Sequence, residues 1–421
     1  MLDLQELAVS HGSPLLLFSA ETFRLRYQEL QTALPQVKHH YALKALPYDE
    51  CIRVIQHCDG HLDVASIGEI NLVKATAPEM LARCIYTHPI KTKRDIELAL
   101  EMGVQVMVAD NRYELEKLLP YKNQVKLLLR VAFPNPEARC DLSAKFGATM
   151  AEVKNLIRFC LTNGIQLQGL SFHVGSQMID TQSHIRAIQA TRNLYDWCAE
   201  EYDLKLPILN IGGGFPARLD KSIPTITDFC QPIQTCLDEL FPDTEIWSEP
   251  GRCLAADSMA AISQVIGKTV KNKRFWYYLN DGVYNTFSGK IYDHAEYVHE
   301  PLCKGNRAEL FLSVLAGPTC DSIDVLKENM LLPEMEIGDF FLTKQVGAYC
   351  WASRTDFNQL EQTVIVNVDF DLVFLHESNT TLLPMQADSV LFPGNDPWPD
   401  EWCTHFLGQG GSTEFMPELA A

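Results

Sequence analysis

The first two-thirds of this chain of 421 residues alternates short apolar runs with amphipathic stretches, and this alternation constrains the fold more than any other feature. In Thr92–Met102 and Ala151–Thr162, for example, apolar residues recur at steps of three and four, which is typical of a helix with one buried face. The apolar runs are expected to be strands: Leu15–Ser19, His39–Lys44, Leu62–Ala65, Arg83–Tyr86, Val104–Val108, Lys126–Val131, Leu167–Phe172, Ile208–Ile211 and Glu245–Ser248. Strands in series with helices predict a parallel α/β architecture. Their number fits a (β/α)8 barrel, and a doubly wound sheet is the alternative.

The pattern changes after about Arg252, where few long helices are expected. The strands predicted there are Ala260–Thr269, Phe275–Asn280, Ala308–Val314, Asp339–Leu342 and Thr363–Val368. This change predicts a second, mainly β domain. The segment Phe392–Ala421 is rich in proline, glycine and acidic residues, so we expect a poorly packed tail there.

Composition excludes several classes of function. The chain has 35 basic and 54 acidic residues, a net charge of −19, which disfavours nucleic acid and anionic membrane surfaces as partners. It has no apolar run long enough for a transmembrane helix, and its first residues lack the pattern of a secretory signal. Its 13 cysteines include no CxxC pair, so we expect no metal site and a reducing, cytoplasmic location.

Side chains capable of chemistry gather in five segments near predicted strand ends. These segments are Tyr41–Ala45, Ser171–Ser176, Asn210–Pro216, Glu249–Arg252 and Gly317–Asp324. In a (β/α)8 barrel the carboxyl ends of the strands build the active site. The segments together therefore describe one candidate site if the chain closes into a barrel.

Three of these segments each allow a plain and a functional interpretation. Lys44 closes an apolar strand, so its amine could reach solvent, or a dry pocket could keep it neutral and nucleophilic. The glycines at 212–214 could be a flexible turn or a phosphate cradle, although neither GxxxxGK[ST] nor GxGxxG occurs here. Glu249 and Arg252 could form a plain ion pair, or could face a cationic ring nitrogen and a phosphate respectively.

Two further residues are equally ambiguous when each is taken alone. His173 follows a strand and could be structural, but Gly175 and Ser176 after it could offer donors to an anion. Cys320 could be a packing residue, but it precedes Asp321 in a Gly-Pro loop. An imine-forming lysine, a phosphate cradle and an acid for a ring nitrogen are together the parts that pyridoxal 5'-phosphate needs.

In their order along the chain, these motifs resemble the fold-type III pyridoxal-phosphate decarboxylases, above all those that act on ornithine. The resemblance spans about Pro14 to Leu360. It rests on the segments YALKA (41–45), LDVASIGEI (62–70), CDLSAKFGAT (140–149), SFHVGSQ (171–177), IGGGFP (211–216), EPGR (249–252), YYLNDGVYNTF (277–287), YDHA (292–295), GPTCDSID (317–324), LPEMEIGDF (332–340) and GAY (347–349).

The resemblance implies an α/β plus β fold, with a cofactor-binding (β/α)8 barrel at residues 20–252. Residues 1–19 and 253–380 would form the β domain, and residues 381–421 would be an extension of unknown role. The resemblance also implies an obligate head-to-tail homodimer whose two active sites are shared between the subunits. Lys145 and Asp324 match an ion pair between those subunits.

The resemblance also assigns roles to individual residues. Lys44 matches the lysine that forms the Schiff base, His173 the residue that stacks on the cofactor ring, and Glu249 the carboxylate at the pyridine nitrogen. The residues that match the phosphate shell are Ser176, Gly213, Gly214, Arg252 and Tyr349, and those that match acids near the cofactor are Asp63 and Glu69. The residues that match the substrate end are Tyr292, Asp293 and Asp321, and Cys320 matches a proton donor supplied by the partner subunit.

These positions imply decarboxylation of a basic amino acid, with ornithine converted to putrescine as the main hypothesis. Asp293 and Asp321 would be buried without a partner beside a neutral side chain, which favours a substrate with a second amine. The alternatives are a lysine or dual lysine/ornithine enzyme and an enzyme for a diamino-acid-derived intermediate such as a siderophore precursor. Diaminopimelate decarboxylase, a racemase and a non-catalytic regulatory homologue are less favoured.

Departures from the family pattern leave the length of the substrate open. Lys344-Gln345-Val346 precedes the Gly-Ala-Tyr segment and Cys350-Trp351 follows it, unlike the usual surroundings. Phe357-Asn358-Gln359-Leu360 stands where the family has Phe-Asn-Gly-Phe. Both departures fall close to the expected substrate end.

Overall fold

Eight parallel strands close into a barrel in the order of the sequence. The computed structural model describes residues 4–135, 143–302, 309–370 and 372. The barrel strands are β2 (Val37–Ala42), β3 (His61–Val64), β4 (Cys84–Tyr86), β5 (Val106–Ala109), β6 (Lys126–Val131), β7 (Gln166–Phe172), β8 (Ile208–Asn210) and β9 (Glu245–Ser248). Strand β9 pairs with β2, where Ile246 lies opposite Val37, and this pairing closes the barrel. The closed barrel confirms the expected fold class and excludes the doubly wound sheet.

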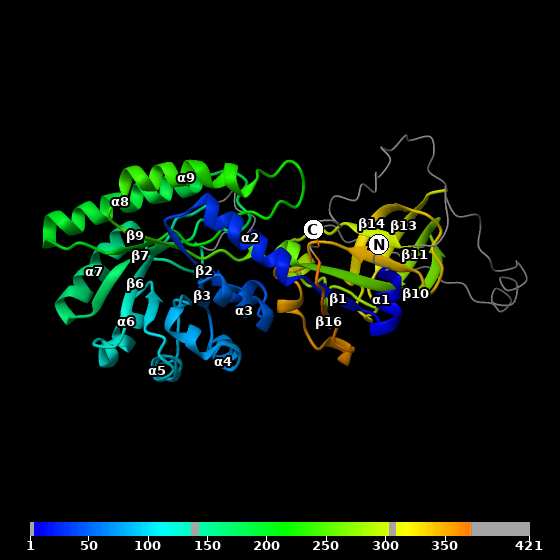
Figure 1. The fold of residues 1–421 in the computed structure, drawn as a ribbon, viewed down its shortest axis with the longest axis horizontal. Coiled ribbons are helices and arrows are strands. Elements are labelled where there is room, and N and C mark those ends of the chain that lie inside the picture. Colours follow the sequence, from blue (N-terminus) through cyan, green and yellow to red (C-terminus); the bar gives the residue numbers. More distant parts are fainter. Residues whose placement is uncertain (1–3, 136–142, 303–308, 371, 373–421) are drawn as a thin grey trace, which may run out of the picture.

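Helices surround the barrel and connect its strands (Figure 1). They are α2 (Ala20–Ala33), α3 (Asp49–His57), α4 (Ile67–Thr76), α5 (Lys93–Glu101), α6 (Arg112–Leu118), α7 (Met150–Asn163), α8 (Gln182–Tyr202) and α9 (Ile226–Leu240). Several begin at residues that cap free backbone N–H groups, such as Ser66 of α4 and Asn111 of α6. These caps matter for function, because they fix the first turns that carry Glu69 and Glu114.

The second unit is an eight-stranded, mostly antiparallel sheet. Its strands are β1 (Leu15–Phe18), β10 (Met259–Lys271), β11 (Arg274–Leu279), β12 (His299–Leu302), β13 (Phe311–Ala316), β14 (Val325–Leu332), β15 (Phe340–Thr343) and β16 (Val364–Asn367). Strand β1 precedes the barrel in sequence but pairs with β10 and β16 in this sheet. Short helices α1 (Leu4–His11), α10 (Arg252–Ala255) and α11 (Gly289–Tyr292) lie at its margins.

Sequence periodicity missed two of these strands. Strand β12 contains a glutamate and a proline in four residues, and β14 contains Lys327-Glu328-Asn329, with Asn329 at a φ of 57°. Neither segment alternates apolar and polar residues, so neither gave the strand pattern. Both strands pair with neighbours that the sequence did identify, β15 and β13 respectively.

The hydrophobic core fills the barrel and the space between the barrel and its helices. Ile85, Val108, Leu128, Ile208 and Trp247 form one buried cluster from five barrel strands. No helix in the described part of the chain is both long and apolar enough to cross a membrane. Residues 381–421, with the expected tail at Phe392–Ala421, lie outside the described residues.

Candidate active site

Lys44 lies just after β2, in the short helix Leu43–Ala45, and faces a carboxylate of the next strand. Its Nζ is 3.0 Å from Oδ2 of Asp63, whose side chain is 1% exposed. The hydroxyl of Thr87, just after β4, donates to the other oxygen of Asp63. Burial acts to lower the pKa of Lys44, but attraction by Asp63, Tyr349 and Glu249 outweighs it, so the pKa is raised. The amine is therefore held as an ammonium in this arrangement.

The glycines after β8 bring backbone into contact with two other functional segments. Gly212 and Gly214 have φ angles of 67° and 102°, in the left-handed region that glycine favours. A Cβ at Gly213 would lie 2.6 Å from the carbonyl oxygen of Glu249 and 3.0 Å from Nε2 of His173. A side chain here would fill the space beside both residues. The loop is therefore a backbone cradle rather than a merely flexible turn.

Glu249, just after β9, is a buried carboxyl at the centre of the site. Nδ2 of Asn210 donates to its Oε1 at 2.7 Å. Burial raises the pKa of Glu249 to about 7, and Asp63 adds to this shift, whereas Lys44, Arg130 and Asn210 oppose it. A buried carboxyl with a raised pKa suits a partner such as a protonated ring nitrogen, whose positive charge would stabilise the carboxylate.

Arg252 begins α10 and is 6% exposed. Its Nη2 lies 3.2 Å from the hydroxyl of Ser176 and 2.6 Å from Oδ2 of Asp293, and its guanidinium lies 4.9 Å from the ring centroid of Tyr349. Its buried Nε has no hydrogen-bond partner among the described residues. An unused donor on a buried cation, next to a hydroxyl and a glycine loop, suits an anionic ligand such as a phosphate.

Three other predicted residues lie around this centre. His173 follows β7, and burial lowers its pKa well below the usual value, so its ring is neutral. Tyr349 donates its backbone N–H to the carbonyl of Ala45, next to Lys44, at 2.9 Å. Glu69 accepts a hydrogen bond from the backbone N–H of Ala65 at 2.6 Å, and burial raises its pKa to about 7.

The substrate-end residues are less closely grouped. Asp293 is 8% exposed and paired with Arg252, which places it within the candidate site. Tyr292, at the end of α11, is 58% exposed. The expectation that both contact the substrate, Asp293 through its distal amine, stays a prediction.

Cys320 and Asp321 lie on the loop between β13 and β14 of the other unit. Asn358 accepts a hydrogen bond from the backbone N–H of Cys320 at 3.1 Å, and its Nδ2 lies 3.5 Å from the thiol sulfur. Tyr284 donates its hydroxyl to Asp321 at 2.5 Å and stacks on Phe357, with ring centroids 4.4 Å apart. The thiol and the carboxylate are thus presented together by their own domain, with Cys320 exposed.

Asp324 and Lys145, the expected pair between subunits, have different surroundings in this chain. Asp324 is 3% exposed and accepts hydrogen bonds from the backbone N–H groups of Val283 and Thr319 and from the Thr319 hydroxyl. Lys145 is exposed, with its Nζ 5.0 Å from the ring centroid of Phe146. An ion pair between subunits stays a prediction.

Sequence reasoning missed three residues that the structure brings into the site. Thr87 supports Asp63, Asn210 supports Glu249, and Asn358 supports Cys320. Thr87 and Asn210 each carried a usable signal, because each is a polar residue at the carboxyl end of a barrel strand. Asn358 belongs to the Phe357–Leu360 segment noted near the expected substrate end, but its contact with Cys320, 38 residues away, could not be foreseen from the sequence.

The residues present fit pyridoxal 5'-phosphate. Lys44 supplies an amine for its aldehyde, Glu249 a carboxyl for its ring nitrogen, and Arg252 with Ser176 and the glycine cradle supply donors for its phosphate. Among the described residues no group of three or more His, Cys, Asp or Glu could hold a metal ion.

Comparison with known proteins agrees with this reading of the geometry. Residues 20–256 match the family model described as the pyridoxal-binding domain of pyridoxal-dependent decarboxylases. The chain is 34% identical to a lysine/ornithine decarboxylase of Selenomonas ruminantium, over 85% of this chain and 90% of that protein. It is 33% identical to an ornithine decarboxylase of Caenorhabditis elegans, over 86% and 88% of the respective chains.

Two further comparisons extend this picture. The chain is 33% identical to antizyme inhibitor 2 of Xenopus laevis, over 79% of this chain and 76% of that protein. Among solved structures, the lysine/ornithine decarboxylase of Vibrio vulnificus complexed with putrescine superposes with a TM-score of 0.81. It is 37% identical, over 86% of this chain and 96% of that one.

Proposed function

Because this chain belongs to the family of pyridoxal-dependent decarboxylases, we propose that it decarboxylates L-ornithine and releases putrescine and carbon dioxide. The chain is a lyase that uses pyridoxal 5'-phosphate, and its substrates are basic amino acids. The observation that carries the proposal is the meeting of Lys44, Glu249 and Arg252 at the carboxyl ends of the barrel strands.

Each of these residues has a defined task in the proposed reaction. Bound pyridoxal 5'-phosphate would supply a sink for the electron pair that stays on Cα when carbon dioxide leaves. Glu249 keeps a proton at the ring nitrogen, and its pKa of about 7 allows it to share that proton. Arg252 and Ser176 would hold the phosphate, while Asp63 holds the Nζ of Lys44 in place.

The substrate end distinguishes basic from neutral amino acids in this proposal. Asp293 and Asp321 are carboxylates, so a terminal ammonium would meet negative charge there in addition to the partners that Arg252 and Tyr284 already give them. One methylene of chain length changes binding in a fitted pocket by only about 1–3 kcal/mol. Relatives named as lysine/ornithine decarboxylases therefore support lysine as a second substrate of this site.

We also propose a homodimer in which each active site borrows Cys320 and Asp321 from the other subunit. Two observations support this assembly: Cys320 is exposed in the single chain, and its loop is held by contacts within its own domain. Cys320 from the partner would then donate the proton that Cα receives after carbon dioxide leaves. The family resemblance implies the same arrangement.

A cytoplasmic location is part of the same proposal. The ten cysteines of the described residues are free, which is typical of a reducing compartment. The net charge of −19 gives no support to nucleic acid as a partner.

The first experiment measures carbon dioxide release by the purified, cofactor-loaded protein. L-ornithine, L-lysine, L-arginine and meso-diaminopimelate are compared, with Lys44→Ala as the inactive control. Release from ornithine with the largest kcat/KM supports the proposal, and a larger value for lysine corrects the substrate. No release from any of the four, with cofactor bound, would reject the proposal and point to a larger diamino-acid conjugate or to a non-catalytic homologue.

A second experiment tests the shared site by mixing two inactive variants, Lys44→Ala and Cys320→Ala. Random exchange of subunits makes half of the dimers mixed, and each mixed dimer has one intact site. About a quarter of the wild-type activity should therefore return. Two inactive proteins that stay inactive on mixing, although subunit exchange is shown by mass, would reject the shared site.

A further inference from the structure

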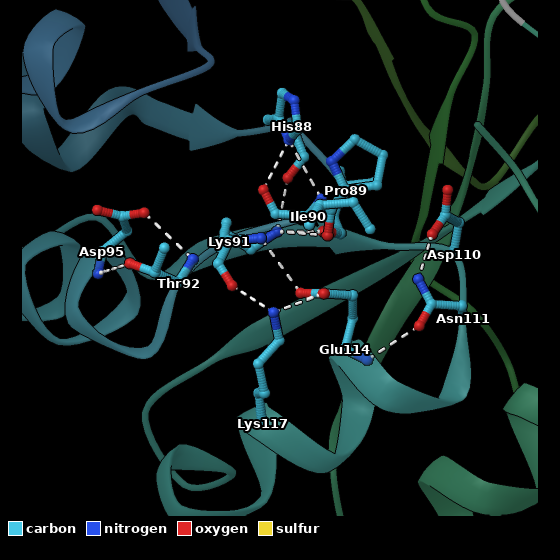
Figure 2. A network of polar contacts seen from close by, with 11 residues as sticks. His88, Pro89, Ile90, Lys91, Thr92, Asp95, Asp110, Asn111, Glu114 and Lys117 are labelled. Atoms are coloured by element: carbon cyan, nitrogen blue, oxygen red, sulfur yellow. Dashed lines mark hydrogen bonds and ion pairs between the residues drawn. The ribbon is translucent and has the colours of Figure 1, made fainter. Parts of the chain in front are cut away.

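Lys91 is a buried lysine in the segment between β4 and α5, away from the residues assigned so far. Its side chain is 2% exposed, and its Nζ donates to three backbone carbonyls (Figure 2). The acceptors are His88 at 2.7 Å, Pro89 at 3.2 Å and Val108 at 2.6 Å. An ammonium has three N–H donors, so the three carbonyls use all of them. Two acceptors belong to the lysine's own segment and the third to strand β5.

These bonds fasten the segment after β4 to the neighbouring strand. The same segment begins with Thr87, whose backbone N–H donates to Val64 and whose hydroxyl donates to Asp63. Asp63 in turn holds the Nζ of Lys44 at 3.0 Å. A continuous series of contacts therefore connects the buried Lys91 to the amine that bonds the cofactor.

We propose that Lys91 is a positioning residue of the decarboxylase site, which fixes Thr87 against Asp63 and thereby fixes Asp63 against Lys44. This inference rests on the proposed function. Lys91 touches neither substrate nor cofactor in this role. Its effect reaches the reaction only through the place and the proton affinity of the Lys44 amine.

The charge of Lys91 matters because burial of an ammonium is costly unless it is well bonded. Burial lowers the pKa of Lys91 to about 7; Glu114 and Asp110 oppose this shift and Lys117 adds to it. A neutral amine has only two N–H donors, so one carbonyl would lose its partner. The attachment of the segment after β4 to strand β5 should therefore weaken as the pH rises through the neutral range.

The other charged and titratable groups around Lys91 each contact a defined partner. Glu114 accepts from the backbone N–H of Lys91 at 3.2 Å and pairs with Lys117 at 2.5 Å (Figure 2). His88 bonds through Nδ1 to the carbonyl of Ile90 at 2.7 Å, and Tyr86 presents its ring 5.3 Å from the Lys91 amine. Lys117 also donates to the carbonyl of Lys91 but to none of the three carbonyls that fasten the segment. Lys117 therefore serves as a control for the loss of a neighbouring lysine that leaves these three bonds in place.

The test is a pH titration of the bound cofactor's absorbance in the full-length holoenzyme, together with kcat/KM. The midpoint reports the proton held at the Lys44 nitrogen, which Asp63 stabilises. In Lys91→Met the midpoint should fall by about one pH unit, because a displaced Asp63 carboxylate would stabilise the proton at the Lys44 nitrogen less, and a nearby opposite charge shifts a pKa by about that much. We also expect kcat/KM to fall about 10- to 100-fold, the scale of a 1 Å misplacement. Lys117→Met should keep the wild-type midpoint.

Three more variants separate positioning from general stability. Thr87→Val should lower the midpoint in the same direction, and the double variant should go no further, because both act through Asp63. Lys91→Gln, which keeps a shorter neutral donor, replaces the methionine variant if that variant does not fold. An unchanged midpoint in folded Lys91 variants, or an equal shift in Lys117→Met, would overturn the inference. A wild-type holoenzyme without activity would instead count against the proposed function.

Discussion

Gly347 occupies a position where even a methyl group has no room, and its replacement by alanine tests how tightly the site is built. A Cβ there would lie 1.8 Å from the carbonyl oxygen of Ala255, whereas real Cβ contacts essentially never fall under 3.0 Å. The Cβ is fixed to the backbone of residue 347 and the oxygen belongs to the backbone of Ala255, so the chain itself must shift by about 1.2 Å. The shift cannot be absorbed by a side-chain rotation.

The shift would reach the cofactor site because the segment around Gly347 is bonded to the barrel side. Gly347 donates its N–H to Ala256, and Tyr349, two residues later, donates to Ala45 beside Lys44. We expect Gly347→Ala to lower the free energy of unfolding by about 1–3 kcal/mol, the usual cost of overpacking. The displacement of Tyr349 should lower kcat/KM about 100-fold, because a 1 Å misplacement has this scale.

The assay compares cofactor affinity, kcat/KM and urea unfolding for Gly347→Ala and Gly68→Ala. Gly68 lies in α4, where the nearest atom to an added Cβ is 3.5 Å away, so the same substitution has space there. Gly68→Ala should keep wild-type cofactor affinity. If Gly347→Ala also keeps cofactor affinity and kcat/KM within about twofold of wild type, the segment does not position the site and our reasoning is refuted.

Three further predictions concern stability and the substrate-end loop. Burial lowers the pKa of His39 and of His184 to about 4, so the folded state disfavours their protonation. The free energy that this contributes to unfolding is fully present above pH 6.5 and is lost between pH 6.5 and 4, by at most about 3 kcal/mol for each histidine. Equal urea midpoints at pH 7.5 and 5 would contradict this. Asp324→Ala leaves three buried donors without their acceptor, so it should lower the free energy of unfolding by about 3 kcal/mol or more. Lys145→Ala, at an exposed position, should change it by less than about 0.5 kcal/mol. Similar losses in both variants would argue against the importance of the Asp324 contacts within the chain. Gln359 has a φ of 51°, in the left-handed region that glycine adopts without strain. Gln359→Gly should therefore leave the free energy of unfolding unchanged or raise it by about 1 kcal/mol. A loss of more than about 1 kcal/mol in urea unfolding would show that the side chain contributes more than the backbone strain costs.

Much of the fold and of the site's composition could be predicted from local features. Each strand–helix unit has its own periodicity, and the barrel follows from their number, so β6 and β9 have the bounds expected from the sequence. Lys44, Glu249 and the glycines at 212–214 could be selected because each stands directly after a strand. These are local properties, and a local pattern is enough to show them.

Only the tertiary structure decided which side chains meet across long separations in sequence. Strand β1 joins a sheet whose other strands follow the whole barrel, because its four buried residues pair with β10. Asp63 is reached by Thr87 and Lys44 only because β2, β3 and β4 lie side by side in the closed barrel. The bond of Lys91 to Val108 likewise depends on β4 and β5 lying side by side. Hydrogen bonds depend on distances between atoms, and the folded backbone alone sets those distances for residues far apart in the chain.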